Sequence, residues 1–554
     1  MGWYRAVALD LDGTLTTGGW PHSGVLEAIA AWRADGVQML LVTGRILADL
    51  EVEFPGLADR FDMVVAENGC VIRTTDWTRT LADPVDPALL ERLHTAGVAV
   101  RRGRVLLATD ADARHAVLDA VEALGLDVHL MRNRSAMMLI PPGITKGTGL
   151  QQALAELGVS RHNTLAVGDA ENDHALLAAA GLGVAVGNAV DSLRRHADLV
   201  LAAANGAGVI DLLTGPVMDG RQRIHPPRWR IVVGTDAAGR PATLPAAQTN
   251  LLITGDSESG KSYLAGLVIE QLVALGYSLL VVDPEGDHVS LGALRGVTVL
   301  AGTKLPDPAE LPSLYGDGVR SLVLDLSRLH PDIRDHYLDG LWGSMSRHRA
   351  ETGMPHWVVL EEAQNLRSCR SPHGPTNSPW DWGLCLVSYQ PYQIAPDLLA
   401  RMEWRVELSP GGRNAILTPP TGTPYPFTVG RRTTRHVRHW RKYVDSQLPR
   451  ELWFVFRDNS AATGLVAGNL REFVTALQTV PAAVIAHHAR NGDFSHWVGA
   501  VYRDHVAAAL VATTEHDLIA HADPERTRRL LTELIAFRYL PPDPPPSLSG
   551  PQTS

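Results

Sequence analysis

Short apolar runs and amphipathic stretches alternate along the first 213 residues of the chain. The apolar runs have the length of strands and read AVALDLD, MLLVTG, MVVAENG, TLAVGD and GVAVGN. Strands that alternate with amphipathic helices predict a doubly wound, parallel α/β sheet. Residues 81–144 interrupt this order with a β/α pattern of their own, which predicts a cap inserted into the first domain.

A second α/β series follows a linker at 214–230 that is rich in Pro and Arg, and it occupies residues 231–430. Its apolar runs include LLITG, SLLVVD, SLVLDLS, HWVVLEE and LCLVSYQ. Residues 440–540 then become mainly helical after one short strand, which predicts a separate C-terminal module. The tail at 541–554 is rich in Pro and Ser and is expected to be disordered.

The composition of the 554-residue chain excludes several classes of protein. Hydrophobic residues make up 45% and charged residues 20%, as in globular domains rather than disordered chains. A net charge of -10 excludes a protein that is basic throughout and coats nucleic acid, although a local basic patch stays open. Three cysteines without CxxC spacing, and no apolar run near the ~20 residues that cross a bilayer, predict a cytoplasmic protein without a membrane partner.

Polar side chains that suit a cation and a phosphate stand at the strand ends of the first domain. Asp10 and Asp12 lie two residues apart after the first strand, so both can face one ligand. The later positions are Thr43, Lys146, Asp169, Asn172 and Asp173. Carboxylates suit a hard cation such as Mg²⁺, while an ammonium and a hydroxyl suit phosphoryl oxygens.

These motifs, DLDGT, TGR, the lysine of ITKG and GDAEND, resemble in type and order those of the haloacid dehalogenase (HAD) superfamily. The ENG at 67–69 and the VGNA at 186–189 resemble its Cof-type, subclass IIB phosphatases. The resemblance covers residues 5–213. It implies a Rossmann-like parallel sheet with an inserted α/β cap, and a phosphatase that forms an aspartyl-phosphate.

The same resemblance assigns roles to the residues of the motifs. It implies that Asp10 is the nucleophile and Asp12 the general acid and base. It implies that Thr43 and Lys146 bind the phosphoryl oxygens. The Mg²⁺ ligands that it implies are Asp10, the backbone carbonyl of Asp12, Asp169 and, in support, Asp173.

The substrate stays open between sugar phosphates, phosphoglycolate and other small phosphorylated metabolites, which are the substrates of this family. In the family the cap contributes to specificity, and arginines suit a second anionic group on a substrate. We expect most arginines of the cap to lie on its solvated surface. The arginines of this cap are Arg101, Arg102, Arg104, Arg132 and Arg134.

A second phosphate motif, GDSESGKS, lies between the strand run NLLIT and a helical run in the second α/β series. It fits GxxxxGK[ST], the P-loop pattern, in the strand–loop–helix context that the pattern requires. Gly255 and Gly260 permit a loop whose N–H groups wrap the phosphates of ATP. Lys261 would reach the β- and γ-phosphates and Ser262 would ligate Mg²⁺.

The apolar run HWVVL ends in Glu361 and Glu362, which is typical of a Walker-B strand. Glu362 is the candidate base, and Glu361 stands where an Asp is usual, so that its longer side chain is expected to displace the metal contact. Gln390 ends the next strand and suits sensing of the γ-phosphate. The block at 228–410 resembles HerA/FtsK-type ATPases, which implies a P-loop NTPase domain and a homo-oligomer. In that family an arginine from a neighbouring subunit completes the nucleotide site, and the candidates here are Arg401 and Arg405.

Two further clusters of residues each have a structural and a functional interpretation. Residues 431–443 concentrate Arg, His and Trp, which suits nucleic acid, but we favour a solvated linker face. His487, His488 and His496 could suggest a metal site in the C-terminal module, but packing or surface histidines are preferred because no Cys or acid completes a set.

The sequence thus predicts a Mg²⁺-dependent phosphomonoesterase for a small phosphorylated metabolite, with an ATP-binding second domain that regulates it. The alternative is a nucleic-acid-linked HerA/FtsK-type ATPase with an auxiliary phosphatase, and a third hypothesis is a P-loop domain that only binds nucleotide. The substitution at Glu361 and the mild acidic charge favour the first hypothesis over the second.

Overall fold

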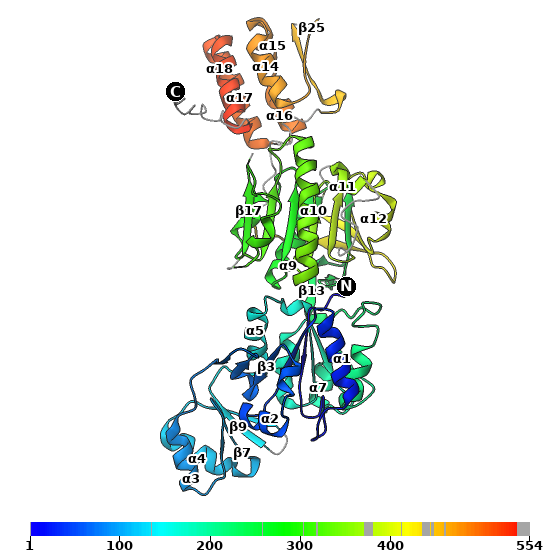
Figure 1. Ribbon diagram of the computed structural model, residues 1–554. Coiled ribbons are helices and arrows are strands. Elements are labelled where there is room, and N and C mark those ends of the chain that lie inside the picture. The colour runs from blue at the N-terminus through cyan, green and yellow to red at the C-terminus, as the bar shows by residue number, and fades with distance from the viewer. Residues whose placement is uncertain are drawn as a thin grey trace, which may run out of the picture. The chain divides into compact units, whose positions relative to one another are not determined.

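The computed structural model describes residues 2–133, 136–256, 259–302, 304–316, 319–370, 381–411, 413–434, 444, 448–458, 461–502 and 504–539. The chain divides into two compact units, residues 1–284 with 288–436, and residues 285–287 with 437–554. The first unit contains two large sheets, and the second contains helices and a hairpin (Figure 1). The predicted α/β class with a parallel sheet is confirmed.

The first sheet has the strand order β12-β11-β10-β1-β2-β3-β4-β5. The strands from β12 to β3 are parallel, and β4 and β5 continue the sheet as antiparallel strands. The strands are β1 (Ala6–Leu9), β2 (Gln38–Val42), β3 (Met63–Ala66), β4 (Val71–Arg73), β5 (Thr78–Thr80), β10 (Thr164–Gly168), β11 (Leu182–Ala185) and β12 (Leu199–Val200). The helices are α1 (Ser23–Ala34), α2 (Leu47–Glu53), α5 (Lys146–Glu156), α6 (His174–Ala179), α7 (Asp191–His196) and α8 (Asn205–Leu213).

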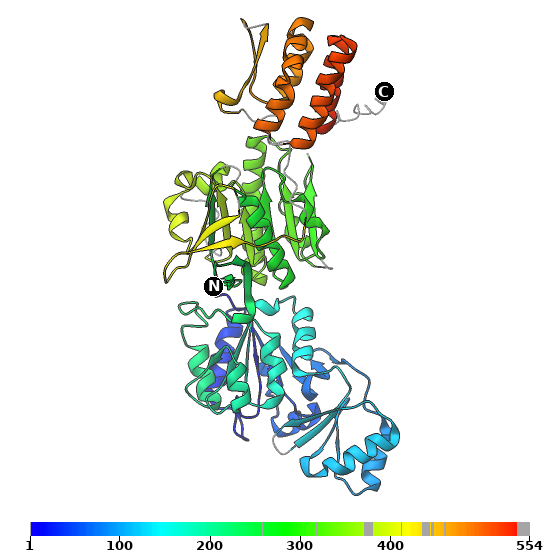
Figure 2. The ribbon, with the colours of Figure 1, turned by 180° about the vertical axis from the view of Figure 1, so that it is seen from behind.

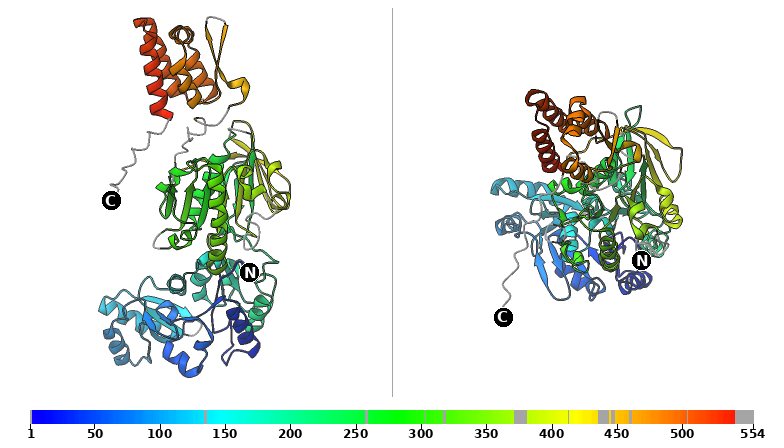
Figure 3. Two further views of the ribbon diagram at one scale, coloured as in Figure 1. Left: turned by 45° about the horizontal axis from the view of Figure 1, so that its top comes forward. Right: turned by 90° about the horizontal axis from the view of Figure 1, so that it is seen from above.

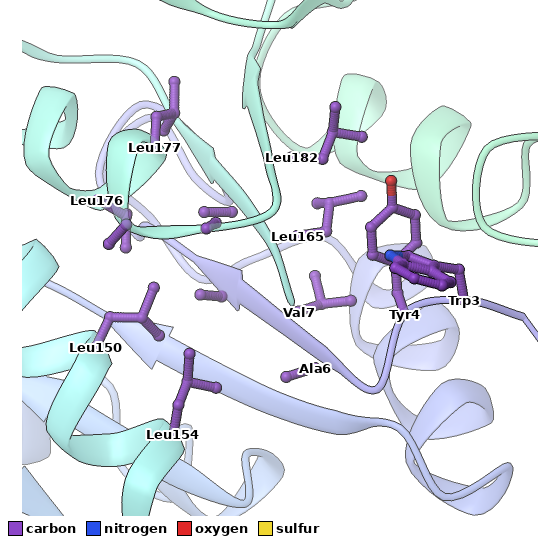
Figure 4. Packing of buried hydrophobic residues seen from close by; sticks show 14 of the residues in the cluster. Trp3, Tyr4, Ala6, Val7, Leu150, Leu154, Leu165, Leu176, Leu177 and Leu182 are labelled. Atoms are coloured by element: carbon purple, nitrogen blue, oxygen red, sulfur yellow. The ribbon is translucent and has the colours of Figure 1, made fainter. Parts of the chain in front are cut away.

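The central strand β1 is buried on both faces, because helices cover both sides of the sheet. All four of its residues, Ala6–Leu9, are fully buried. This explains why its sequence is a continuous apolar run rather than an alternating one. Figure 4 shows leucines of α5 and α6 in the core around β1 and its neighbour β10, and two aromatic residues beyond the N-terminal end of β1: Leu150, Leu154, Leu176, Leu177, Trp3 and Tyr4.

A smaller antiparallel sheet with the order β6-β7-β9-β8 lies within the interval predicted as a cap. Two helices share a separate apolar core with this sheet, which includes Leu89, Val117 and Leu139 (Figure 2). The elements are α3 (Pro87–Thr95), β6 (Arg101–Arg102), β7 (Leu107–Asp110), α4 (Arg114–Leu124), β8 (His129–Asn133) and β9 (Ala136–Ile140).

The second large sheet has the order β14-β13-β23-β22-β21-β15-β20-β19-β16-β18-β17. The strands from β21 to β17 are parallel and the other four are antiparallel. The strands are β13 (Arg230–Thr235), β14 (Pro241–Pro245), β15 (Leu251–Gly255), β16 (Leu279–Asp283), β17 (Val297–Ala301), β18 (Ser321–Asp325), β19 (Trp357–Leu360), β20 (Leu384–Ser388), β21 (Trp404–Leu408), β22 (Asn414–Thr418) and β23 (Tyr425–Val429).

Two helices cover the two faces of this sheet, α9 (Lys261–Ala274) and α10 (Pro331–Thr352). Successive residues of β16 point to opposite faces, as in any strand. Leu280 therefore shares a core with Leu341 of α10, whereas Val281 shares a core with Val268 of α9. Two shorter helices follow β19 and β20, namely α11 (Arg367–Arg370) and α12 (Pro396–Ala400).

A buried aromatic seam joins the two sheets within the first unit. The imidazole of His162 stacks on Tyr277 with ring centroids 3.8 Å apart, and it meets the edge of Trp229 at 4.7 Å. Its Nε2 lies 3.1 Å from the carbonyl oxygen of Leu275. Burial lowers the pKa of His162 to about 3, so this ring is neutral in the folded chain.

The residues of this seam come from one particular edge of each sheet. Trp3 and His162 stand just before β1 and β10 of the first sheet. Tyr277 and His356 stand just before β16 and β19 of the second sheet, and the rings of Trp3 and His356 are 5.9 Å apart. Both sheets therefore meet through the N-terminal ends of their parallel strands.

In the part of the second unit that the structure describes, five helices pack beside a hairpin (Figure 3). Its core is aromatic, with Phe454, Phe473, Phe494 and Trp497 in contact. The elements are β24 (Phe454–Asp458), β25 (Ala461–Ala467), α14 (Leu470–Thr479), α15 (Ala482–Asn491), α16 (Asp493–Val501), α17 (His505–His521) and α18 (Pro524–Tyr539). Among the helices of the described chain, none has the length and apolar character needed to cross a membrane.

Candidate active site

The first candidate site lies at the carboxyl ends of the strands of the first sheet. Asp10 follows β1 directly, and its backbone N–H donates to the carbonyl of Val167 at 3.0 Å. The Asp10 residue is only 3% exposed. Asp12 follows two positions later, and its side chain is 34% exposed. The predicted pair of acids is therefore divided into one buried and one accessible carboxylate.

Lys146 joins Asp10 to the last motif of the domain. Its Nζ donates to Asp10 Oδ1 and to Asp173 Oδ1, both at 2.6 Å, and the lysine is 1% exposed. The position follows from a local signal, because Thr145 and Thr148 form a capping box that starts α5 at Lys146. Gly149 then lets α5 approach the backbone, since a Cβ there would lie 2.6 Å from Cα of Gly69.

The turn after β10 supplies the other two acids. Asp173 Oδ2 accepts from the backbone N–H groups of Asp169 at 2.9 Å and Ala170 at 3.0 Å, which fixes the turn. Thr14 Oγ1 donates to Asp169 Oδ1 at 3.3 Å. Within the described residues, Asp10, Asp169 and Asp173 each bring an oxygen within 4.8 Å of the others, and all three are buried. Such a set fits a hard divalent cation.

The charges of this cluster do not balance, since three buried carboxylates face one ammonium. Burial and the charge of Asp173 raise the pKa of Asp10 well above its usual range, against the opposing charge of Lys146. Burial opposes the charge of Lys146, but the carboxylates of Asp10 and Asp173 outweigh it and raise the pKa of the lysine. A divalent cation would relieve this excess of negative charge, which is a second reason why the cluster fits one.

Thr43 and Asp12 lie on the neighbouring loops. Thr43 is fully buried after β2, the strand paired with β1, and its Oγ1 accepts from the N–H of Arg45 at 3.1 Å. Both oxygens of Asp12 accept from Arg45, with Nε and Nη2 at 2.7 Å. The sequence assigned no role to Arg45, although it belongs to the TGR motif.

The ENG turn brings two further residues to the site that the sequence did not single out for a role. Asn68 has a left-handed backbone with φ of 56°, and its Oδ1 accepts from Asn172 Nδ2 at 3.1 Å. Glu67 is fully buried and accepts from the backbone N–H groups of Arg104 and Val105, both at 2.9 Å. This turn therefore connects the loops of the first sheet to the inserted domain. The ENG motif was the signal in the sequence that could have pointed to these two residues.

The second candidate site surrounds the P-loop motif between β15 and α9. Gly255 and Gly260 have φ values of 152° and 91°, which favour glycine. Lys261 is the first residue of α9, and its Nζ donates to the carbonyl of Asp256 at 2.8 Å. This Nζ also lies 5.8 Å from the ring centre of Tyr389.

The two glutamates after β19 contact different partners. Glu361 accepts from the Ser262 hydroxyl at 3.4 Å and pairs with the buried His288 at 2.6 Å. The longer side chain thus stays beside Ser262, and His288 is a residue that sequence reasoning missed. Glu362 has a left-handed backbone with φ of 47° and accepts from the side chain of Gln364.

Gln364 connects Glu362 to the next strand end. Its Oε1 accepts from the Ser388 hydroxyl at 2.6 Å, and Ser388 in turn accepts from the N–H of Gln390 at 3.1 Å. The predicted sensor position is therefore linked to the candidate base through hydrogen bonds. Arg401 pairs with Asp381 at 3.5 Å, and Arg405 donates to the carbonyl of Met402 at 3.3 Å.

His488 of the C-terminal module is buried, whereas His496 is exposed. His488 Nδ1 lies 2.7 Å from Asp493, and its Nε2 accepts from the N–H of Arg457 at 2.8 Å, so both ring nitrogens are engaged. Asp493 is an acid that the sequence reasoning missed beside His487 and His488. Of the basic segment at 431–443, residues 435–443 lie outside the described residues, and Arg432 pairs with Glu270 at 3.1 Å.

Comparisons with known proteins concern the first domain. Residues 7–115 and 121–213 match the model of the haloacid dehalogenase-like hydrolase family. A phosphoglycolate phosphatase of Methanothermobacter thermautotrophicus is 36% identical over 216 residues, which cover 37% of this chain and 96% of that relative. A phosphoglycolate phosphatase of Halorubrum lacusprofundi is 34% identical over 221 residues, covering 37% of this chain and 95% of the relative.

The solved structure of a haloacid dehalogenase-like hydrolase from Bacteroides thetaiotaomicron is 21% identical in sequence, with a TM-score of 0.34. The match covers 38% of this chain and 98% of the chain of that hydrolase. The curated relatives are matched over nearly their whole length by the domain that carries the Asp10 site. Through this N-terminal domain, the chain belongs to the haloacid dehalogenase-like hydrolase family.

Proposed function

We propose that the first domain hydrolyses a small phosphomonoester through an aspartyl-phosphate on Asp10. The observation that carries the proposal is the buried cluster at the strand ends, in which Lys146 contacts both Asp10 and Asp173. A nucleophilic carboxylate needs a cationic partner that also neutralises an incoming phosphoryl group, and Lys146 is placed to be that partner.

In the proposed reaction, a carboxylate oxygen of Asp10 attacks phosphorus and the bond to the leaving oxygen breaks. Asp12 gives a proton to the leaving alkoxide, and then takes a proton from the water that cleaves the aspartyl-phosphate. Lys146 and Thr43 hold the phosphoryl oxygens. Asp10, Asp169, Asp173 and the carbonyl of Asp12 would hold Mg²⁺, which supplies positive charge to the phosphoryl group.

Phosphoglycolate is the first substrate to test, since the two relatives named above are phosphoglycolate phosphatases. Sugar phosphates are the second class. The test is a release assay for inorganic phosphate with the purified full chain, Mg²⁺ and a panel of phosphoglycolate, hexose phosphates and aryl phosphate, each with and without ATP. Release from at least one phosphomonoester is expected, and an inactive chain across the whole panel in Mg²⁺ would contradict the proposal.

A second candidate function is nucleotide binding at the P-loop domain, favoured by the contact of Ser262 with Glu361 beside Lys261. ATP with Mg²⁺ is the proposed ligand. Its binding would regulate the phosphatase, or it would drive a HerA/FtsK-type motor that acts on nucleic acid as a homo-oligomer. ATP hydrolysis that DNA stimulates, in a chain without phosphatase activity, would favour the motor.

Replacing Lys261 by alanine is expected to weaken ATP binding about 10- to 100-fold, because one charge-assisted hydrogen bond to the phosphates is lost. Fluorescent ATP titration in Mg²⁺ measures the affinity. Lys304→Ala, at an exposed lysine, is the matched control and should bind as the wild type does. Equal affinity of Lys261→Ala and the control would contradict nucleotide binding at this loop.

A further inference from the structure

The guanidinium of Arg45 binds the carboxylate of Asp12, which the proposed reaction needs as its acid and base. Nε and Nη2 of Arg45 donate to the two oxygens of Asp12, both at 2.7 Å, in a bidentate fork. A carboxyl group that gives a proton must direct one oxygen at the leaving group, whereas both oxygens of Asp12 are directed at the guanidinium of Arg45. Release of one arm of the fork would leave one oxygen of Asp12 free to face a leaving group.

Arg45 is held in place by contacts that do not involve Asp12. Its Nη1 pairs with Glu53, and its guanidinium carbon lies 4.9 Å from the ring centre of Phe54. Its backbone N–H and carbonyl bond to Thr43 and to the N–H of Glu67. The fork would thus keep its position when Asp12 turns away, and it would then present two N–H donors to another planar anion.

We propose that a carboxylate of the substrate takes the place of Asp12 on Arg45 and thereby frees Asp12 to act on the ester oxygen. This inference rests on the proposed phosphatase function. The substrate class is a phosphomonoester with a carboxylate one or two carbons from its ester oxygen. The carboxylate matches the fork in shape and charge, whereas the hydroxyls of a sugar phosphate carry no charge to compete with Asp12.

The arginines of the cap are less suited to this task. The described ones are exposed, namely Arg101, Arg102, Arg104 and Arg132, and Arg134 lies outside the described residues. Arg101 already pairs with Asp49 of α2 at 3.2 Å. Arg45, by contrast, has a side chain that is 23% exposed and directly contacts the proposed acid. Arg45 is therefore the arginine that we assign to the second anion of the substrate.

The test compares kcat/KM for phosphoglycolate and for hydroxyethyl phosphate, in which a neutral CH₂OH replaces the carboxylate. We expect wild type to prefer phosphoglycolate by at least about tenfold, which corresponds to one charge-assisted contact. In Arg45→Gln the ratio of the two kcat/KM values should fall toward one. We expect kcat/KM to be lower for phosphoglycolate and higher for hydroxyethyl phosphate than in wild type. Arg45→Lys, which keeps the charge without the fork, should retain part of the preference.

Arg73→Gln is the matched control, because Arg73 also binds two acids, Glu51 at 3.2 Å and Asp59 at 3.1 Å, and its side chain is 20% exposed. It should keep the wild-type ratio. An equal fall for both substrates in Arg45→Gln, or an unchanged ratio in a chain whose circular dichroism is native, would overturn the inference. Equal hydrolysis of the two substrates by wild type would also overturn the inference about Arg45 but would leave the proposed phosphatase function intact. No phosphate release from either substrate would contradict the phosphatase function itself.

Discussion

Replacing Asp10 by asparagine is expected to lower kcat for every phosphomonoester by at least about 10⁴-fold, since a nucleophile cannot be replaced by its neutral isostere. The stability of the fold should not decrease. Burial and the charge of Asp173 already raise the pKa of Asp10, so a neutral group at this position removes repulsion among buried carboxylates. Phosphate release in Mg²⁺ and a thermal melt of the same preparation measure both effects.

Asp59→Asn is the control for this substitution, because Asp59 is an exposed acid of the same domain that pairs with Arg73. It should leave phosphate release near the wild-type rate. Activity of Asp10→Asn within about tenfold of wild type would exclude Asp10 as the nucleophile. A melt that falls strongly together with activity would assign the loss to unfolding instead.

Replacing Lys146 by methionine is expected to destabilise the first sheet by about 3–5 kcal/mol, because three buried carboxylates then lack their cation. The chain has several domains, so a single unfolding free energy is not defined. Hydrogen exchange of the amides of β1, followed by mass spectrometry without Mg²⁺, measures the local loss of protection. Phosphate release should vanish as well.

The double variant Asp10→Asn/Lys146→Met tests the electrostatic cause. It removes one negative charge along with the ammonium, so it should recover part of the protection that Lys146→Met loses. Lys304→Met at an exposed lysine should leave β1 protected. A loss below about 1 kcal/mol in Lys146→Met, the level of an exposed ion pair, would show that the cluster is solvated.

Much of this arrangement could be predicted from the sequence because the signals are local. Continuous apolar runs mark strands buried on both faces, and acids at their ends converge because parallel strands end at one edge of a sheet. The predicted α/β class and the HAD-type first domain are confirmed on this basis. The meeting of Lys146 with Asp10 and Asp173 also follows from position, since Lys146 begins a helix that a capping box starts.

The contacts that could not be predicted are those set by side-chain direction. Nothing in TGR tells whether Arg45 faces solvent, a substrate or Asp12, because the answer depends on Glu53 at the end of α2 and on Phe54 just after it. The same holds for His288, whose pairing with Glu361 joins residues that lie 73 positions apart. In the C-terminal module, Asp493 meets His488 only because α16 begins at that residue.

The seam of His162 and Tyr277 fixes the directions in which the two candidate sites face. The parallel strands of both sheets begin at this seam and end at the sites, so the sites open in opposite directions. With five residues in β10 and five in β16, at about 3.3 Å per residue, the two sheets together separate the sites by roughly 30 Å. A ligand that leaves one candidate site must therefore pass through solvent to reach the other.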